Sequence, residues 1–207
     1  MVSGLPENDF ARYDESPDED FYTQPRLVTH IDDGAIAAVT DLYRAFFPAG
    51  GDIIDLMSSW VSHLPPETRY NRVVGQGMNE AELAANGRLT ERLAHNLNAD
   101  PRLPYEDASF DGAGMCVSVQ YLTRPVEVFR EVGRVLRPGA PFVVTFSNRC
   151  FPTKAVAVWQ SLDDQGHIAL VRRYCEEAGN WGDIEAREAR RGSWRGDPLY
   201  GVIGRRR

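Results

Sequence analysis

The spacing of apolar residues in the first third of the chain predicts one helix and two short strands. Between residues 36 and 46 apolar side chains recur every three or four positions, which is typical of an amphipathic helix, and Asp32 or Asp33 can cap its N-terminus. Short apolar runs follow at residues 52–56 and 72–75, separated by a turn-like segment rich in proline. We expect a helix, a strand, a connection and a second strand.

The alternation of strands and helices continues along the chain. Residues 79–93 have helical spacing that Gly87 interrupts, and residues 94–98 are a candidate third strand. Alternating strands and helices imply a mostly parallel α/β sheet with helices on both faces, closed by an antiparallel hairpin. The later pattern predicts in order a buried strand, a helix, a strong strand, two helices and two terminal strands, at residues 113–122, 125–136, 140–148, 152–162, 167–179, 183–190 and 199–207.

The beginning of the chain differs in composition from the rest. Residues 1–20 collect acidic side chains and contain few large apolar ones, which indicates a mobile or loosely draped arm. Order is expected to begin near Phe21. Because a chain of 207 residues suits one sizeable core, we expect an acidic flexible arm at residues 1–20 and a single domain at residues 21–207.

The bulk composition excludes several classes of protein. The formal net charge of -7 works against phosphate-backbone binding, so no nucleic-acid partner is expected. No apolar run approaches the roughly 20 residues of a membrane-spanning helix, and the amino terminus has no secretory signal, so we expect a soluble, cytoplasmic protein with no membrane partner. The cysteines, Cys116, Cys150 and Cys175, lack metal-ligand spacing, which predicts reduced thiols and no metal site.

The second half of the chain carries a recognisable succession of motifs. LPYEDASFDG at residues 103–112 leads into AGMCVSVQYL, and PVEVFREVGRVLRPG then leads into APFVVTFSN. This succession resembles the class I S-adenosylmethionine-dependent methyltransferases, in particular a subgroup of small-molecule and quinone-type enzymes. The resemblance covers roughly residues 50–150. It implies a Rossmann-like sheet of seven strands and S-adenosylmethionine as the cofactor.

The first motif of that family is altered in this sequence. In the family an acid at the end of the first strand precedes a glycine-rich turn, because glycine lets the backbone approach the cofactor. Here the stretch DIIDLMSSW supplies the acid, Asp55, but Met57, Ser58 and Ser59 replace the glycines. Gly77 stands where a second acid normally binds the ribose. These departures fit either an altered cofactor site or a pocket that has drifted to recognition without methyl transfer.

The candidate site residues lie at the predicted strand ends and just before the first helix. Tyr22 can shield a sulfonium by cation–π contact or anchor the fold, and His30 can act in the site or cap a helix. Arg149 suits either a bidentate grip on a carboxylate or a structural ion pair. We expect His30, Tyr121 and Arg149 to handle the substrate, and cofactor binding by Tyr22, Asp55, Met57, Ser58, Ser59, Gly77, Met78, Asn79, Asn98, Asp100 and Ser118.

Two functions follow from the resemblance. The first is a cytoplasmic S-adenosylmethionine-dependent methyltransferase that acts on a small molecule. The second is a non-catalytic methyltransferase-like module that binds a ligand or a partner protein, which the missing glycines and ribose acid favour. Retained cofactor affinity distinguishes the two.

Overall fold

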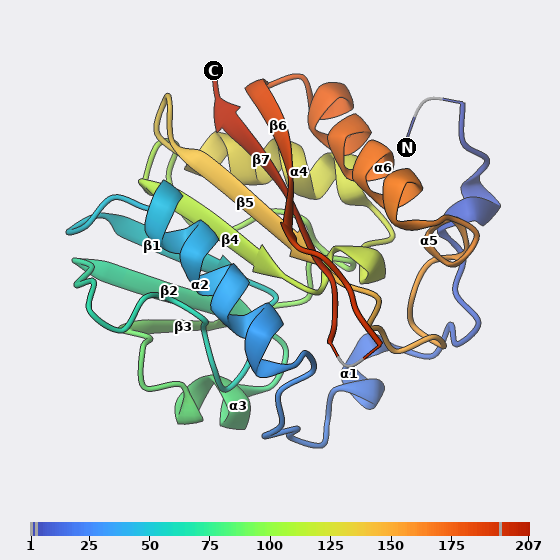
Figure 1. Cartoon of the computed structure of the whole chain (residues 1–207), viewed down its shortest axis with the longest axis horizontal. Coiled ribbons are helices and arrows are strands. Elements are labelled where there is room, and N and C mark those ends of the chain that lie inside the picture. Colours follow the sequence, from blue (N-terminus) through green and yellow to red (C-terminus); the bar gives the residue numbers. More distant parts are fainter. Residues whose placement is uncertain (1, 3, 195) are drawn as a thin grey trace.

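The computed structural model describes residues 2, 4–194 and 196–207, and its central feature is a seven-stranded sheet with helices on both faces (Figure 1). The strand order is β3-β2-β1-β4-β5-β7-β6, in which β7 runs antiparallel between β5 and β6 and the other neighbours are parallel. The predicted fold class is therefore confirmed. The strands are β1 (Asp52–Leu56), β2 (Arg72–Gly77), β3 (Glu91–Ala94), β4 (Gly112–Cys116), β5 (Pro141–Phe146), β6 (Trp181–Arg190) and β7 (Leu199–Arg206).

Helices cover the two faces of the sheet unequally. Alternate residues of a strand point to opposite faces, so Val143 packs with α2 whereas its neighbour Phe142 packs with α4 and α6. Among the described residues no helix is both long enough and apolar enough to cross a membrane. The helices are α1 (Asp18–Phe21), α2 (Asp33–Phe46), α3 (Glu80–Ala85), α4 (Pro125–Val135), α5 (Ala157–Gln160) and α6 (Asp164–Ala178), with 3-10 turns η1 (Glu7–Phe10) and η2 (Val119–Tyr121).

The first predicted helix is confirmed, but the segment after β2 was predicted wrongly. The Asp32 side chain accepts a hydrogen bond from the Ala35 N–H and caps α2 as expected. Residues 79–93 are not one helix, because α3 stops at Ala85 and the chain then pairs with β2 as β3. The third strand therefore lies earlier than residues 94–98. Its side chains alternate between half-buried and exposed, so its apolar signal in the sequence is weak.

Two other predicted elements are shorter than expected. The strand predicted at residues 113–122 ends at Cys116, because Val117 adopts a left-handed conformation with φ of 49° and turns the chain away. The helix predicted at residues 152–162 is reduced to α5. Before α5, Val156 pairs with Arg12 in an isolated β-bridge and its N–H donates to the Gln120 carbonyl oxygen, so this part of the chain is extended.

The connection between β1 and β2 contains no helix in the structure. Parallel neighbours are usually joined by a helix that packs on the sheet. Residues 57–71 instead form an irregular loop. No helix N-terminus therefore follows β1, and any anion bound beyond β1 has to find its donors elsewhere.

The acidic arm packs on the body, which differs from the expectation of a loosely draped segment. Phe10 is buried and its ring lies 6.3 Å from that of Tyr174. The ammonium of Lys154, a fully buried residue, donates to the Ser16 carbonyl oxygen at 2.7 Å and lies 3.5 Å from the Asp18 carboxylate. The acidic composition was misleading because this carboxylate is paired with a buried cation rather than with water.

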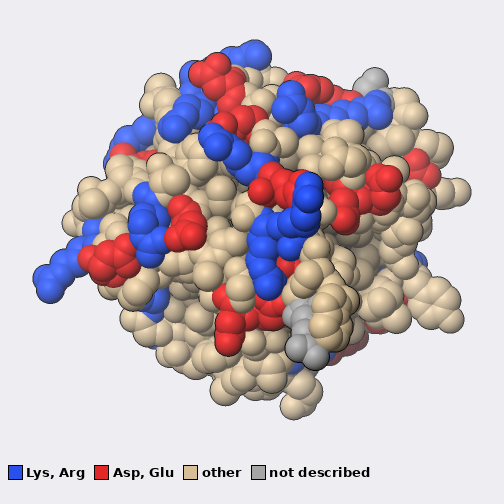
Figure 2. Space-filling view, viewed as in Figure 1, with Lys and Arg blue, Asp and Glu red and all other residues tan. Residues whose placement is uncertain are grey.

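The arginines near the C-terminal hairpin are largely paired. Arg190 forms an ion pair with Asp32, and Arg191 forms one with Glu188. On the face of the molecule in Figure 2, basic and acidic side chains are interspersed in small groups. This face lacks the concentrated basic surface on which phosphate-backbone binding depends.

Candidate functional site

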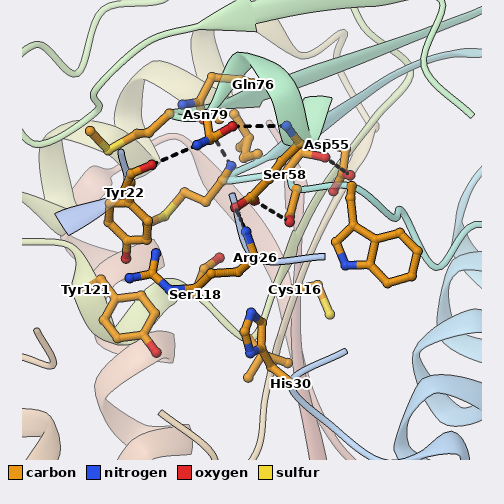
Figure 3. Close-up of a pocket in the computed structure, with 18 of the residues that line it drawn as sticks. Tyr22, Arg26, His30, Asp55, Ser58, Gln76, Asn79, Cys116, Ser118 and Tyr121 are labelled. Carbon is orange, nitrogen blue, oxygen red and sulfur yellow. Dashed lines mark hydrogen bonds between the residues drawn. The ribbon is translucent and has the colours of Figure 1, made fainter. Parts of the chain in front are cut away.

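A cavity of about 270 Å³ lies at the carboxyl ends of β1, β2 and β4 (Figure 3). Ligands of open α/β sheets bind at this edge. Residues 22–32, which join α1 to α2 and which we call the strap, cover the cavity. Asp100 is exposed and does not line the cavity, and its carboxylate accepts from the Arg102 N–H. The other predicted site residues all line it: Tyr22, His30, Asp55, Met57, Ser58, Ser59, Gly77, Met78, Asn79, Asn98, Ser118, Tyr121 and Arg149.

The turn after β1 is held by a side chain instead of by glycine. Met57 has a φ of 50°, in the left-handed region that glycine adopts most readily. Its N–H donates to Gln76 Oε1 at 3.0 Å, and the Ser58 N–H donates to the Gln76 carbonyl oxygen at 2.7 Å. Gln76 is buried in β2, and its amide also donates to the His95 carbonyl oxygen. Gln76 therefore fixes the turn, a role that the sequence analysis missed.

Asp55 is buried beneath this turn and is bound by serine hydroxyls. Ser58 Oγ donates to Asp55 Oδ2 at 2.6 Å, and Ser62 Oγ donates to the same oxygen. Ser62 Oγ in turn accepts from the Asn86 side-chain amide at 2.9 Å. Burial raises the pKa of Asp55 to about 6, although both serine hydrogen bonds lower it. The hydrogen bond from Ser58 therefore ties the turn to the Asp55 side chain beneath it, while burial disfavours the charged form of that side chain.

The end of β2 carries no acid because the turn lies directly over it. A Cβ on Gly77 would collide with the carbonyl oxygen of Ser58, which belongs to the rigid backbone of the turn. Any larger residue at this position would push the turn away from β2. The glycine that allows close backbone packing at this site therefore lies at the end of β2, as Gly77, and not in the turn after β1.

The first turn of α3 joins the strap to the turn after β1. Asn79 caps α3 by accepting from the Glu82 N–H at 3.0 Å, and its amide donates to the Tyr22 carbonyl oxygen at 2.9 Å. The buried carboxylate of Glu82 accepts from Ser59 Oγ at 2.5 Å and from the Arg26 N–H at 2.6 Å. Ser59 and Asn79 thus line the cavity, but their polar groups are already hydrogen-bonded within the protein.

Asn98 is also committed to internal contacts. Its amide donates to Asp18 Oδ2 and to the Tyr121 carbonyl oxygen, both at 3.0 Å, and its oxygen accepts from the Thr123 N–H at 2.9 Å. The Tyr121 hydroxyl accepts from the Phe151 N–H at 2.8 Å. Through these hydrogen bonds Asn98 and Tyr121 stabilise the wall of the cavity.

The predicted catalytic residues have different surroundings. His30 lies at the mouth of the cavity, with its ring 5.2 Å from that of Phe151, and partial burial lowers its pKa. Arg149 Nε donates to Asp197 Oδ1 at 2.8 Å, and the Arg149 side chain is 61% exposed. Arg149 therefore forms the structural ion pair that was its alternative role, and only His30 keeps an unengaged titratable group facing the cavity among the three.

Two buried polar atoms of the cavity lining have no partner among the described residues. One is Ser118 Oγ, at the end of β4, and the other is Arg26 Nη1, from the strap. Buried polar groups in proteins are nearly always hydrogen-bonded, so such atoms point to a missing partner. Arg26 was not singled out by the sequence analysis.

Part of this chain is similar to known proteins. Residues 58–144 match a family model described as a methyltransferase domain. The chain is 27% identical over 97 residues to the biotin biosynthesis bifunctional protein BioHC of Teredinibacter turnerae, and 34% identical over 70 residues to the sterol 4-C-methyltransferase strm-1 of Caenorhabditis elegans. These alignments cover 44% and 32% of this chain but only 17% and 21% of the relatives. The chain thus spans about a fifth of their length.

Solved structures share the fold over most of the chain. The PH0226 protein of Pyrococcus horikoshii OT3 superposes with a TM-score of 0.63 at 15% identity, covering 91% of this chain and 99% of that one. An S-adenosylmethionine-dependent methyltransferase from Mesorhizobium loti gives a TM-score of 0.55 at 18% identity, covering 82% and 98%. At such identities the likeness establishes the fold.

Proposed function

We propose that this chain is a class I S-adenosylmethionine-dependent methyltransferase that binds its cofactor in the cavity and methylates a small molecule. Its fold and its match to a methyltransferase domain support this proposal. The observation that carries the proposal is the cavity itself. It lies at the ligand-binding edge of the sheet, between β1, β2 and β4, and the strap covers it. Cofactor and acceptor would meet under this cover.

The cavity lining fits the chemistry of the cofactor. S-adenosylmethionine carries hydroxyls, a carboxylate and an adenine. The cavity lining offers several aromatic rings and two buried groups without a partner among the described residues, the Ser118 hydroxyl and the Arg26 Nη1 group. A ligand with those groups gives Ser118 Oγ and Arg26 Nη1 the partners that burial otherwise denies them. When bound, the cofactor supplies an electrophilic methyl group.

The chain's own residues would position the acceptor and take up its proton. Methyl transfer needs in-line placement and exclusion of water more than a covalent partner. The strap contributes Tyr22 and His30, and Phe151 lies against the His30 ring, so these side chains close the cavity from one side. Because partial burial lowers the pKa of His30, its ring is neutral at neutral pH and can accept a proton from an acceptor hydroxyl or amine.

A non-catalytic module remains the second candidate, and a specific observation favours it. The side chains of Asp55, Asn79 and Asn98 form hydrogen bonds with other residues of the protein, and no helix begins between β1 and β2. These side chains are then not available for the hydrogen bonds to S-adenosylmethionine that the resemblance to the methyltransferases implies. Loss of methyl transfer with retention of the fold would then be expected.

Calorimetric titration with S-adenosylhomocysteine tests the proposal. We expect one-to-one binding to the wild-type chain and weaker binding to Ser118→Val, whereas Ser109→Val, outside the cavity lining, should bind as the wild type does. Transfer of label from methyl-labelled S-adenosylmethionine to the small-molecule fraction of a cell extract then tests the acceptor class. Absence of binding at millimolar ligand contradicts the enzyme. Binding without transfer to any fraction supports the module.

A further inference from the structure

Arg26 of the strap is held rigidly at the wall of the cavity. Its backbone N–H donates to Glu82 Oε1 at 2.6 Å, and its Nη2 donates to the Phe21 carbonyl oxygen at 2.9 Å. The guanidinium carbon lies 4.5 Å from the ring centre of Phe21 and 5.4 Å from that of Phe151. Stacking against aromatic faces suits guanidinium better than ammonium. The side chain is therefore oriented in advance, with little rotational freedom left to lose on binding.

The remaining terminal nitrogen of this guanidinium has no partner. Nη1 is buried and donates to no atom of the described residues, and Arg26 belongs to the cavity lining (Figure 3). The guanidinium is permanently charged, so it cannot escape this cost by losing a proton. A buried, charged and unsatisfied N–H group is best satisfied by an anion, and a carboxylate matches the guanidinium geometry.

The other charged groups in the cavity wall are already satisfied by the protein. Asp18 pairs with Arg12 and Lys154, and Arg149 pairs with Asp197. The carboxylates of Asp55 and Glu82 each accept from serine hydroxyls, as described above. Arg26 therefore stands out as the charge in the cavity wall that still lacks a counter-group.

We propose that Arg26 binds a carboxylate of the ligand in the cavity and thereby does the work that a helix N-terminus after β1 would otherwise do. This inference rests on the proposed function and names the residue through which the site recognises its ligand. The carboxylate belongs either to the amino-acid part of the cofactor or to the acceptor. Both sources present the same chemistry to Nη1, and the experiment below separates them.

The first arm of the experiment compares two adenosine thioethers. S-adenosylhomocysteine has a carboxylate, whereas 5′-methylthioadenosine lacks the whole amino-acid part. Arg26→Met should lower the affinity for S-adenosylhomocysteine at least about tenfold, as expected for loss of a charge-assisted hydrogen bond. Its affinity for 5′-methylthioadenosine should be unchanged. The matched control is Arg92→Met, an exposed arginine of β3 outside the cavity lining, which should change neither affinity. This result assigns the carboxylate to the cofactor.

The second arm probes the acceptor side with phenylacetate and its neutral analogue phenylacetamide, titrated by NMR. If Arg26→Met spares S-adenosylhomocysteine but abolishes the preference for phenylacetate over phenylacetamide, the carboxylate is the acceptor's. Arg26→Lys keeps the positive charge but loses the bidentate geometry of the guanidinium, so its affinity for the carboxylate ligand should lie between those of wild type and Arg26→Met. This variant also tests the proposal if Arg26→Met fails to fold.

The proposal is overturned if neither carboxylate ligand distinguishes Arg26→Met or Arg26→Lys from the wild type. It is overturned equally if 5′-methylthioadenosine loses as much affinity as S-adenosylhomocysteine, since Arg26 would then support the cavity without reading a carboxylate. Failure of the wild type to bind either thioether contradicts the proposed function instead. In that case the phenylacetate comparison alone decides the role of Arg26.

Discussion

The carbonyl oxygen of Ser58 lies 2.3 Å from the position that a Cβ on Gly77 would take. Because this oxygen belongs to backbone that Gln76 also holds, it cannot move away cheaply. Gly77→Ala should therefore lower the free energy of unfolding by about 1–3 kcal/mol, the usual cost of overpacking, and weaken ligand binding with it. Urea denaturation measures the first effect. Gly87→Ala is the control, since a Cβ there meets nothing within 4 Å; equal effects of the two substitutions would contradict the close contact.

Asp55 should make the stability of the protein depend on pH in an unusual direction. Its pKa is raised to about 6 by burial, so between about pH 4 and pH 6 the folded state holds a proton that the unfolded state has released. Stability contributed by this group is present below pH 4 and is lost as pH rises through 6. Asp55→Asn should therefore be more stable than wild type at pH 7, by on the order of 3 kcal/mol, with the difference vanishing near pH 4. Urea denaturation at four pH values tests this; a pH-independent difference would count against it.

The ion pair between Asp18 and Lys154 should stabilise the packing of the arm. Asp18 is 5% exposed and lies between Arg12 and the fully buried Lys154, so removing its charge takes the buried carboxylate away from both cations and leaves them only more exposed acidic partners. Asp18→Asn should cost about 3–5 kcal/mol of unfolding free energy, the range for breaking a buried pair. Thermal denaturation should show a lowered midpoint, and limited proteolysis should cut residues 4–16 faster. Asp20→Asn, in the same helix but exposed, should leave both unchanged.

If His30 accepts the acceptor's proton, the pH dependence of methyl transfer should reveal it. Partial burial lowers the pKa of His30, so kcat/KM should rise with pH along a limb centred below the usual histidine value and level off by neutral pH. His30→Gln should lower kcat about 100-fold and remove that limb. His63→Gln also changes a histidine of the cavity lining and should keep the limb. A limb that persists in His30→Gln would assign the proton to another group.

The fold could be predicted where apolar spacing is strong. The run that contains Phe142 and Val143 is wholly buried on both faces, and this pattern marks a central parallel strand. The prediction failed for β3, a sheet-edge strand with Glu91 and Arg92 in its short span. That error also misplaced Asp100, because the true strand end lies several residues earlier and brings Asn98 to the cavity instead.

The candidate site was predicted mainly from strand ends, and strand ends carry only part of it. Asp55 and Ser118 follow apolar runs and were found for that reason. Arg26 was missed because its contact with Glu82 joins residues 56 positions apart, which no local pattern reveals. Gln76 left a usable signal: a polar side chain within the apolar run of β2 has to be paired once it is buried.

The position of β7 decides when during synthesis the sheet becomes safe from aggregation. β7 follows β6 along the chain but lies between β5 and β6 in the sheet (Figure 1). Until residues 199–206 leave the ribosome, the apolar strand β5 keeps one edge unpaired, and such an edge is a template for pairing with other chains. A fragment that stops before Leu199 contains every residue that lines the cavity and still exposes this edge. We therefore expect a nascent chain to lose this tendency to self-associate when β7 is translated, rather than when the cavity is complete.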